Sequence, residues 1–383
     1  MTSIPLIDGA FLIDNSTLEH YQACAWFYYA TDIRLRVPVA NRAGRNFGST
    51  LHAGWRTRYR MCGADAVPEG ALPVINQSMR EWLEEHPQPE DDFRNYDHAC
   101  RVMAAYNEVY GNEPFKIISQ PCSWIKIENS GVGFEHLLVP GNEIHWTGTN
   151  GTTYTSVIRK EIGYRQYSTT DGEIYIEQIK EVKPATKRII ESSFVVPLGT
   201  VNTIPILYCG RIDLGIEDNE GIWSFDHKTA FQFGGSFTDQ MEQDGGQRGY
   251  TWALRKTLGT SVVGYKINAV RIRRPNKDGI TPVDETDFLR IPKHLSEEDL
   301  EDWRSDVLNL IEHIFYCHTH DQWPRSRRSC VGRYGRCDMF DVCTVARGSR
   351  EAALESNLFT ANTWTPLNIT TRKENYDNGK ENK

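Results

Sequence analysis

Residues 204–230, IPILYCGRIDLGIEDNEGIWSFDHKTA, decide the predicted fold of this chain. Two apolar runs flank the segment Asp218-Asn219-Glu220-Gly221, and a short polar segment that ends in glycine is typical of a hairpin loop. We therefore predict two neighbouring strands, with Asp213 inside the first and Asp226 near the end of the second. Residues two apart share one face of a strand, so Lys228 should point to the same side as Asp226.

The polar residues of these strands indicate a chemistry. Two carboxylates on buried strands repel each other, and burying them is costly unless a cation lies between them. Oxygen ligands of this kind suit Mg²⁺ or Mn²⁺. Asp213, Asp226 and Lys228 therefore favour metal-assisted hydrolysis of a phosphodiester, with the lysine orienting water or offsetting phosphate charge. The alternative is that both acids are ordinary strand-end residues and that Lys228 is their solvated partner.

The flanking segments extend the prediction to an α/β fold with a mixed central sheet flanked by helices. A strand over 188–198 precedes the hairpin, a helix over 238–258 follows it, and another strand covers 261–274. On that helix, spacings of three and four predict a polar stripe along one face, formed by Gln240, Gln243, Gln247 and Tyr250. An ordinary wet helix face usually carries Lys and Glu instead, so this stripe could hold water, phosphate or bases.

The N-terminal region reads as helical. One helix is expected over 16–36, a second from about Gly48 to Arg60 with His52 on it, and more helix at about 77–87 and 93–110. Seven arginines and no acid occur from Arg34 to Arg60. Such a run is usually a solvated face, but it could also follow a phosphate backbone.

Three cysteines close together follow a long helix that is expected from Ser296 to about Cys317. Cys330, Cys337 and Cys343 supply three thiolates and need a fourth ligand. The distant Cys24 could provide it, or a local zinc site could form with Cys317 and with His318 or His320. Spacing alone does not decide between the two.

Composition excludes several classes of protein. The chain has 383 residues and a formal net charge of −8, which argues against a surface coated with nucleic acid but allows a local basic channel. Nine cysteines, an odd number, make a disulfide framework improbable. No apolar run approaches the roughly 18 residues of a membrane span, and no phosphate-binding glycine motif is found. The first residues are acidic rather than basic, so we expect no secretory signal.

The order of these motifs resembles the PD-(D/E)xK superfamily, specifically RecB-like nucleases that carry an iron–sulfur cluster. The CRISPR-associated exonucleases of that group and their phage-encoded counterparts are the expected relatives. The resemblance covers roughly residues 16–343. It depends on the following segments in sequence: Cys24 in YQACAWFYY, His52 in FGSTLHA, Glu191 in IIESSF, Asp213 in GRIDLG, Asp226-His227-Lys228, Gln247-x-x-Tyr250, and the clustered cysteines.

The resemblance implies a restriction-endonuclease-like core and a role for each motif. Asp213, Asp226, His52 and the backbone carbonyl of His227 would hold Mg²⁺ or Mn²⁺, and Lys228 would activate water. Gln247 and Tyr250 would support the site, and Glu191 would be the acid before the metal-binding aspartate, with Glu135 as a competitor. A 4Fe-4S cluster would be bound by Cys24, Cys330, Cys337 and Cys343. Contacts to DNA would come from Arg56, Arg60, Tyr250, Arg328 and Arg333.

The expected organisation is a helical region at 1–115, a nuclease core at 116–280, a cysteine segment at 281–349 and a mobile tail at 350–383. A hairpin insertion is expected within the core at about 141–183. The expected activity is that of a DNA exonuclease acting on single strands or DNA ends, and a catalytically inactive DNA-binding or adaptor protein is the alternative. A helicase or recombination protein could act with it in trans. We expect a cytoplasmic protein, in the host cytoplasm if it is phage-encoded.

Overall fold

The computed structural model describes residues 4–7, 9–39, 43–68, 70–87, 89, 92–120, 125–126, 143–147, 152–163, 166–175, 178–183, 187–332 and 335–361. The chain forms two compact units, one made of residues 1–117 and 190–383 and the other of residues 118–189. The expected regions at 1–115, 116–280 and 281–349 do not correspond to these units, because the N-terminal helices, the sheet and the cysteine segment all belong to the first.

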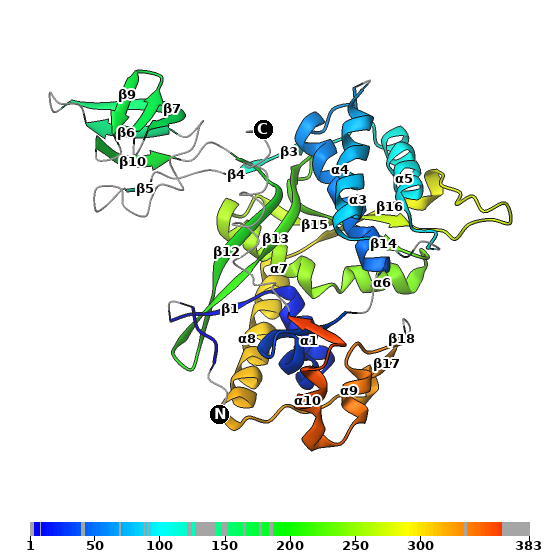
Figure 1. Cartoon of the computed structure of the whole chain (residues 1–383). Coiled ribbons are helices and arrows are strands. Elements are labelled where there is room, and N and C mark those ends of the chain that lie inside the picture. The colour runs from blue at the N-terminus through cyan, green and yellow to red at the C-terminus, as the bar shows by residue number, and fades with distance from the viewer. Residues whose placement is uncertain are drawn as a thin grey trace. The chain divides into compact units, whose positions relative to one another are not determined.

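A seven-stranded mixed sheet forms the centre of the first unit (Figure 1). Its main path runs in the order β1-β13-β14-β15-β16, and β3 and β12 also pair with β13. The strands are β1 (Phe11–Ile13), β3 (Lys116–Ile117), β12 (Ile190–Val201), β13 (Ile204–Glu217), β14 (Ile222–Ala230), β15 (Val262–Arg271) and β16 (Phe288–His294). Strand β1 is parallel to β13, so the N-terminal region contributes a strand that the sequence analysis did not predict.

The predicted hairpin is confirmed. Strands β13 and β14 are antiparallel, with Leu214 opposite Phe225, and the backbone N–H of Asp218 donates to the carbonyl of Gly221 at 3.0 Å. After β14 the chain passes through two helices and returns as β15, parallel to β14. This β-α-β crossover is what places polar residues of β14 beneath the helix that follows.

Helices bury both faces of this sheet, which confirms the α/β class. One core joins α7 and α8 to β13 and β15, through Trp252 and Trp303 among others. The other joins α3, α4 and α5 to β13 and β14, through Trp55 and Trp223. The helices are α3 (Ala43–Cys62), α4 (Ala71–Glu85), α5 (Tyr96–Val109), α7 (Gly245–Leu258) and α8 (Glu297–His320).

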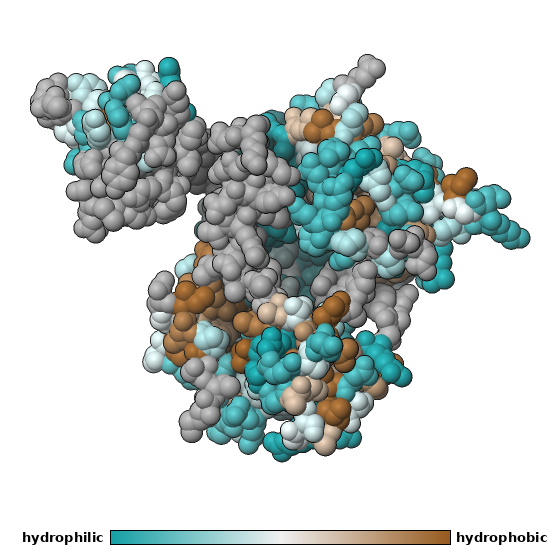
Figure 2. Space-filling view, in the orientation of Figure 1, coloured by the Kyte–Doolittle hydropathy of each residue, from teal (hydrophilic) through white to brown (hydrophobic). Residues whose placement is uncertain are grey.

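The surface helices expose their polar sides. Figure 2 shows largely hydrophilic residues over α3 and α4 on this face of the molecule. Helix α8 begins as predicted at Ser296, whose hydroxyl accepts from the backbone N–H of Asp299 at 3.0 Å while the Asp299 carboxylate accepts from the Ser296 N–H. In the part of the chain that the structure describes, every helix is too short or too polar to cross a membrane.

Two helices expected to be continuous are interrupted. The helix expected over 16–36 is divided into α1 (Asn15–Ala23), α2 (Ala25–Tyr28) and a π-helical turn at Tyr29–Ile33, because Cys24 adopts an extended backbone. The helix expected over 238–258 is divided into α6 (Gly235–Glu242) and α7, because Asp244 starts a new helix by accepting from the N–H of Gln247. The single polar stripe predicted for this segment is therefore wrong.

The C-terminal segment is ordered further than expected. After α8 come short elements at Arg327–Ser329, β17 (Val331–Gly332), β18 (Gly335–Arg336), α9 (Phe340–Thr344), Arg347–Ser349, α10 (Arg350–Leu354) and β19 (Phe359–Ala361). Strand β19 pairs with β2 (Arg36–Pro38), and Arg34 forms ion pairs with Glu351 and, at 2.9 Å, with Glu355. Residues 350–361 are thus not a free tail, and residues 362–383 lie outside the described part.

The second unit contains a six-stranded antiparallel sheet in the order β5-β10-β6-β7-β8-β9. Its strands are β5 (Ile125–Lys126), β6 (Glu143–Thr147), β7 (Thr153–Gly163), β8 (Gln166–Thr169), β9 (Gly172–Tyr175) and β10 (Ile179–Lys183). Ile144, Ile158 and Ile174 are among the residues of its own small core. The insertion expected at about 141–183 lies within this unit, which is longer.

The second unit begins and ends at neighbouring points. The short strands β4 (Ser119–Gln120) and β11 (Lys187–Arg188) pair with each other where the chain enters and leaves it. On the central sheet, Ile117 of β3 lies opposite Ile216, and Ile190 of β12 lies opposite Leu214. Strands β3 and β12 therefore follow one another along the same edge of β13.

Helix α7 packs unusually closely on β13 at Gly249, which provides a test of the fold. A Cβ atom there would lie 2.2 Å from the Tyr208 hydroxyl and 2.8 Å from Trp303. We expect Gly249→Ala to lower the free energy of unfolding by about 2 kcal/mol in urea denaturation, because overpacking outweighs the gain in helix propensity. Gly235→Ala is the matched control, since a Cβ at Gly235 meets no atom within 4 Å. Equal stability of the two variants would contradict this close packing.

Candidate active site

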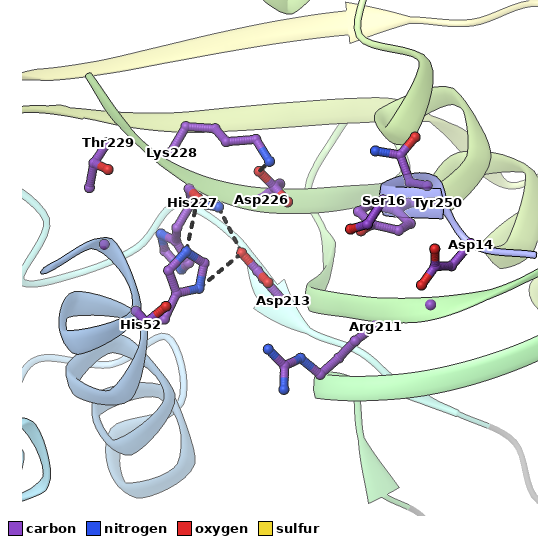
Figure 3. Close-up of a pocket in the computed structure, with 14 residues that line it drawn as sticks. Asp14, Ser16, His52, Arg211, Asp213, Asp226, His227, Lys228, Thr229 and Tyr250 are labelled. Carbon is purple, nitrogen blue, oxygen red and sulfur yellow. Dashed lines mark hydrogen bonds and ion pairs between the residues drawn. The ribbon is translucent and has the colours of Figure 1, made fainter. Parts of the chain in front are cut away.

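A polar pocket of about 470 Å³ opens where the predicted site residues meet (Figure 3). It is formed by strands β13 and β14 together with the start of α1, the first half of α3 and Tyr250 of α7. The lining residues are Asp14, Asn15, Ser16, Gly48, Ser49, His52, Gly210, Arg211, Asp213, Asp226, His227, Lys228, Thr229 and Tyr250. Helix α3 approaches β14 closely here, because a Cβ at Gly48 would lie only 3.2 Å from the Thr229 hydroxyl.

Three side chains from three elements converge at one side of this pocket. The His52 Nδ1 atom lies 3.4 Å from an Asp213 carboxylate oxygen and 3.5 Å from a Glu191 oxygen. One ligand atom from each residue lies within 4.8 Å of the others. Strand pairing places Ile190 opposite Leu214 and Ser192 opposite Ile212, so Glu191 lies across from Asp213. The group therefore has the donor types and the spacing of a site for a hard divalent cation.

The orientation of His52 is fixed by the backbone of β14. Its Nε2 atom lies 3.1 Å from the carbonyl oxygen of His227, and a carbonyl can only accept, so Nε2 carries the proton. In neutral His52 the lone pair of Nδ1 then faces the two carboxylates. Three electron-rich atoms that face one another require a cation between them, either a proton on Nδ1 or a metal ion.

The pKa values of His52 and Asp213 reflect the same need for a positive charge among these side chains. Burial lowers the pKa of His52, but the carboxylates of Asp213 and Glu191 outweigh burial and raise this pKa to about 9. Burial raises the pKa of Asp213 to about 7, with the nearby Asp226 and Glu191 adding to the effect and His52 opposing it. Both residues therefore retain protons that an ordinary histidine or aspartate would have lost at neutral pH.

Backbone geometry at Glu191 is unusual. This residue adopts the left-handed conformation, with φ of 50°. Such a conformation costs about 1 kcal/mol or more in a residue other than glycine, and it persists where the surrounding contacts enforce it. Here the Glu191 carboxylate is held by Arg211, whose Nε lies 2.7 Å away. Glu135, the sequence alternative to Glu191, lies outside the described residues.

Asp226 and Lys228 form a second polar pair on the adjacent strand. Their side chains point to the same side of β14, as predicted, and the lysine Nζ lies 2.9 Å from an Asp226 carboxylate oxygen. Burial lowers the pKa of Lys228, but Asp226 and Asp244 outweigh it, so the pKa lies above the ordinary lysine value. The Lys228 side chain is 38% exposed at the pocket, which leaves its ammonium group accessible to a bound anion.

His227, which lies between Asp226 and Lys228 on β14, contributes its backbone rather than its ring to the site. Its N–H donates to the Asp213 carboxylate at 2.9 Å. The ring points to the opposite side of the strand, where it stacks on Trp55 with a centroid distance of 4.2 Å and its Nδ1 pairs with the Asn268 amide. Burial lowers the pKa of this imidazole well below its ordinary value, so the ring stays neutral in the core.

The remaining predicted residues divide into those at the pocket and those away from it. Tyr250 lines the pocket, and Gln247 is buried one turn before it, with a side-chain oxygen that has no hydrogen-bond partner among the described residues. Arg56 and Arg60 lie on α3 but do not line the pocket. Of the arginine run, Arg58 is fully buried and donates to the carbonyls of Gly63 and Tyr110, so it has a structural role.

Among the residues that line this pocket and that the sequence analysis did not assign to the site are Asp14, Ser16 and Arg211. Arg211 precedes Asp213 by two positions, so strand alternation could have placed both on one face. Asp14 is buried, which raises its pKa to about 6 although it caps α1 by accepting from Thr17. No local sequence pattern relates Asp14 to β13, because Asp14 is brought to β13 by the pairing of the preceding strand, β1.

The four cysteines that the resemblance grouped together line one pocket of about 370 Å³, between α2 and the segment after α8. The extended backbone at Cys24 exposes its sulfur to the backbone N–H of Ser326 at 3.2 Å. A second backbone N–H, that of Met339, donates to the Cys337 sulfur at 3.5 Å. Burial raises the pKa of Cys337 and of Cys343, with the neighbouring thiols contributing in the same direction.

The residues of the alternative zinc site have other partners. Cys317 lies 3.3 Å from the Tyr21 hydroxyl, His318 lies 3.4 Å from the Tyr28 hydroxyl, and His320 pairs with the Tyr316 carbonyl at 2.9 Å. None of them lines the cysteine pocket. Arg328 is exposed in the same segment, and Arg333 lies outside the described residues.

Comparison with known proteins adds no identification. No family model matches the chain, and a search of curated proteins found no similar sequence.

The raised pKa values of His52 and Asp213 predict how the stability of the folded protein depends on pH. His52 has a folded pKa of about 9, above its ordinary 6.5, so its stabilising contribution is complete below pH 6.5 and is lost as the pH rises through 9. Asp213 has a folded pKa of about 7, so its contribution is also lost as the pH rises through 7. In EDTA, the melting temperature should therefore fall between pH 6 and 9.

Asp213→Asn should make the melting temperature fall less steeply with pH. The variant has no titrating carboxyl at position 213, and it also lacks the largest cause that raises the pKa of His52. Histidine-selective NMR should show the His52 pKa falling in the same variant. Asp278→Asn, a change at an exposed loop residue, is the control and should follow the wild type. An unchanged slope in Asp213→Asn would contradict the coupling.

Proposed function

We propose that this protein is a metal-dependent DNA nuclease that hydrolyses phosphodiester bonds, built on a restriction-endonuclease-like core. The observation that carries the proposal is the convergence of His52 Nδ1 with the carboxylates of Glu191 and Asp213, beside the Asp226–Lys228 pair. A buried group of this kind needs a cation, and an ammonium group next to it suits an anionic substrate.

His52, Glu191 and Asp213 would hold the ion, and Asp226 lies on the adjacent strand with its carboxylate directed to Lys228. Mg²⁺ or Mn²⁺ bound there would polarise a phosphate and lower the pKa of water. The carbonyl of His227 keeps His52 in the tautomer that offers Nδ1, and the N–H of His227 orients the Asp213 carboxylate. These backbone contacts fix both ligands before any substrate binds.

The cationic groups at the pocket would receive the phosphodiester. Asp226 keeps Lys228 protonated, so Lys228 would act as an ammonium group that positions the phosphate and donates hydrogen bonds to it or to the attacking water. Arg211 is 34% exposed and held by Glu191, and it would pair with a neighbouring phosphate. A pocket open to solvent on one side is compatible with a strand that ends there or passes through it.

The cysteine pocket supports a second part of the proposal, a 4Fe-4S cluster bound by Cys24, Cys330, Cys337 and Cys343. Four sulfurs gather in one pocket, and two of them accept from backbone N–H groups, which stabilise sulfur in its thiolate form. The cluster would join the break between α1 and α2 to the C-terminal segment.

The nuclease proposal predicts complete dependence on the site. Asp213→Asn, Asp226→Asn and Lys228→Ala should each lower the rate of cleavage of end-labelled DNA by at least about 10²-fold. EDTA should abolish cleavage by the wild type, and Mg²⁺ or Mn²⁺ should restore it. Asp278→Asn should cleave at the wild-type rate.

Binding separates the nuclease from the alternative function. If the wild type binds DNA but cleaves neither single nor double strands at any concentration of Mg²⁺ or Mn²⁺, the protein is a DNA-binding or adaptor protein and the proposal is wrong. Full cleavage by all three variants would also contradict it.

The cluster predicts a spectroscopic result. Wild type prepared without oxygen should show the visible sulfur-to-iron absorbance of a cluster, and Cys330→Ser should lose it together with several degrees of melting temperature. Cys100→Ser, a partly buried cysteine on α5, is the control and should keep the absorbance. A colourless wild type that contains zinc would contradict the cluster.

A further inference from the structure

A second groove, of about 840 Å³, continues from the candidate active site. The two share Lys228 and Thr229, which line both. Strand β14 leads directly from one to the other, since Phe231 follows the strand three residues after Lys228. At about 3.3 Å per residue, Phe231 lies roughly 10 Å along the chain from the lysine.

One wall of the groove is aromatic. Phe231 is 49% exposed, although it is a large apolar side chain. Phe233 and Phe237 lie beside it in the groove, with ring centroids 5.5 Å apart and an angle of 34° between the rings. The floor is formed by Phe47 and Ile272, which are buried. Because Phe231 is half-exposed, part of its ring is open to solvent and can stack on a ligand.

Basic side chains also line the groove. Arg94, Arg273 and Arg274 line the groove, and none of the described residues that line it is acidic. Arg273 is held by Asp284 and Asp287, and the guanidinium of Arg94 lies 6.0 Å from the centre of the Phe231 ring. Arg274 is exposed and forms no ion pair or hydrogen bond with the described residues. The Arg274 guanidinium is therefore available to an anionic ligand.

We propose that this groove binds the unpaired strand of a DNA substrate next to the cleaved phosphate, with a base stacked on Phe231 and a phosphate paired with Arg274. The inference depends on the proposed nuclease function and adds to it the residues, Phe231 and Arg274, that would hold the strand outside the metal site. Aromatic faces beside basic side chains are the combination that binds single strands without sequence preference.

Chemistry favours an unpaired strand over a duplex. The faces of bases inside a duplex are covered by their stacked neighbours, so an exposed ring such as Phe231 gains a partner only from an unstacked base. Gln240 of α6 also lines the groove, and its side-chain amide can both donate a hydrogen bond to a base and accept one from it. A protein segment that bound in this groove would need acidic and aromatic side chains side by side, whereas an unpaired strand carries phosphates and bases at every nucleotide.

The test compares binding and catalysis in matched variants. Affinity for a fluorescein-labelled oligothymidylate of about 15 nucleotides is measured by anisotropy in EDTA, at one fixed salt concentration. Phe231→Ala and Arg274→Ala should each weaken this affinity by about tenfold, and Phe231→Trp should retain it. Affinity for a blunt-ended duplex should not change. Tyr316→Ala removes an exposed aromatic elsewhere, and Lys277→Ala removes a nearby charge that does not line the groove, so both should bind as the wild type does.

A small substrate distinguishes this inference from the proposed function. A nitrophenyl ester of thymidine monophosphate reaches the active site without filling the groove, so Phe231→Ala should hydrolyse it at the wild-type rate. If the wild type hydrolyses neither this ester nor DNA, the proposed nuclease function itself is refuted. Cleavage by the wild type with single-strand affinity unchanged in both groove variants would refute the groove alone, as would an equal loss of duplex affinity.

Discussion

Repulsion among buried carboxylates is the constraint on which this structure depends. Glu191, Asp213 and Asp226 approach one another on three adjacent strands, at positions where water is largely excluded. Each acid is offset by a different basic group: Arg211 holds Glu191, His52 faces Asp213, and Lys228 pairs with Asp226. The antiparallel pairing of β12, β13 and β14 and the close approach of α3 bring these partners together. A fold that needed only stability would have filled the same strands with apolar side chains.

The sequence was sufficient to predict the hairpin, the direction of Lys228 and the start of α8, because these features follow from local spacing and capping. The helix breaks at Cys24 and Asp244 were not predicted, since helical periodicity continues across both positions. What interrupts the first helix is a tertiary contact, in which the N–H of Trp26 donates to the carbonyl of Pro324 and Cys24 turns toward Ser326. A contact between residues about three hundred positions apart leaves no local pattern in the sequence.

The candidate site was predicted better from residue chemistry than from geometry. Asp213, Asp226, Lys228 and Tyr250 all reach the pocket, whereas Arg56 and Arg60 of α3 do not line it. Charge counts alone could not separate Arg58, which satisfies buried carbonyls, from an arginine such as Arg274 that is free to bind an anion. The difference lies in whether the guanidinium already has acceptors, and only the folded structure reveals its acceptors.

The arrangement of β3 and β12 bears on how far the 118–189 unit is independent of the central sheet. These two strands follow one another along the same edge of β13, and the 118–189 unit leaves and rejoins the sheet between them through its own closing pair, β4 and β11. The unit is thus a module set into a single interrupted strand, and joining residue 117 to residue 189 would restore that strand in register, since Ile117 lies opposite Ile216 and Ile190 lies opposite Leu214. Such a module can be exchanged, enlarged or lost while the central sheet keeps its strand order and register.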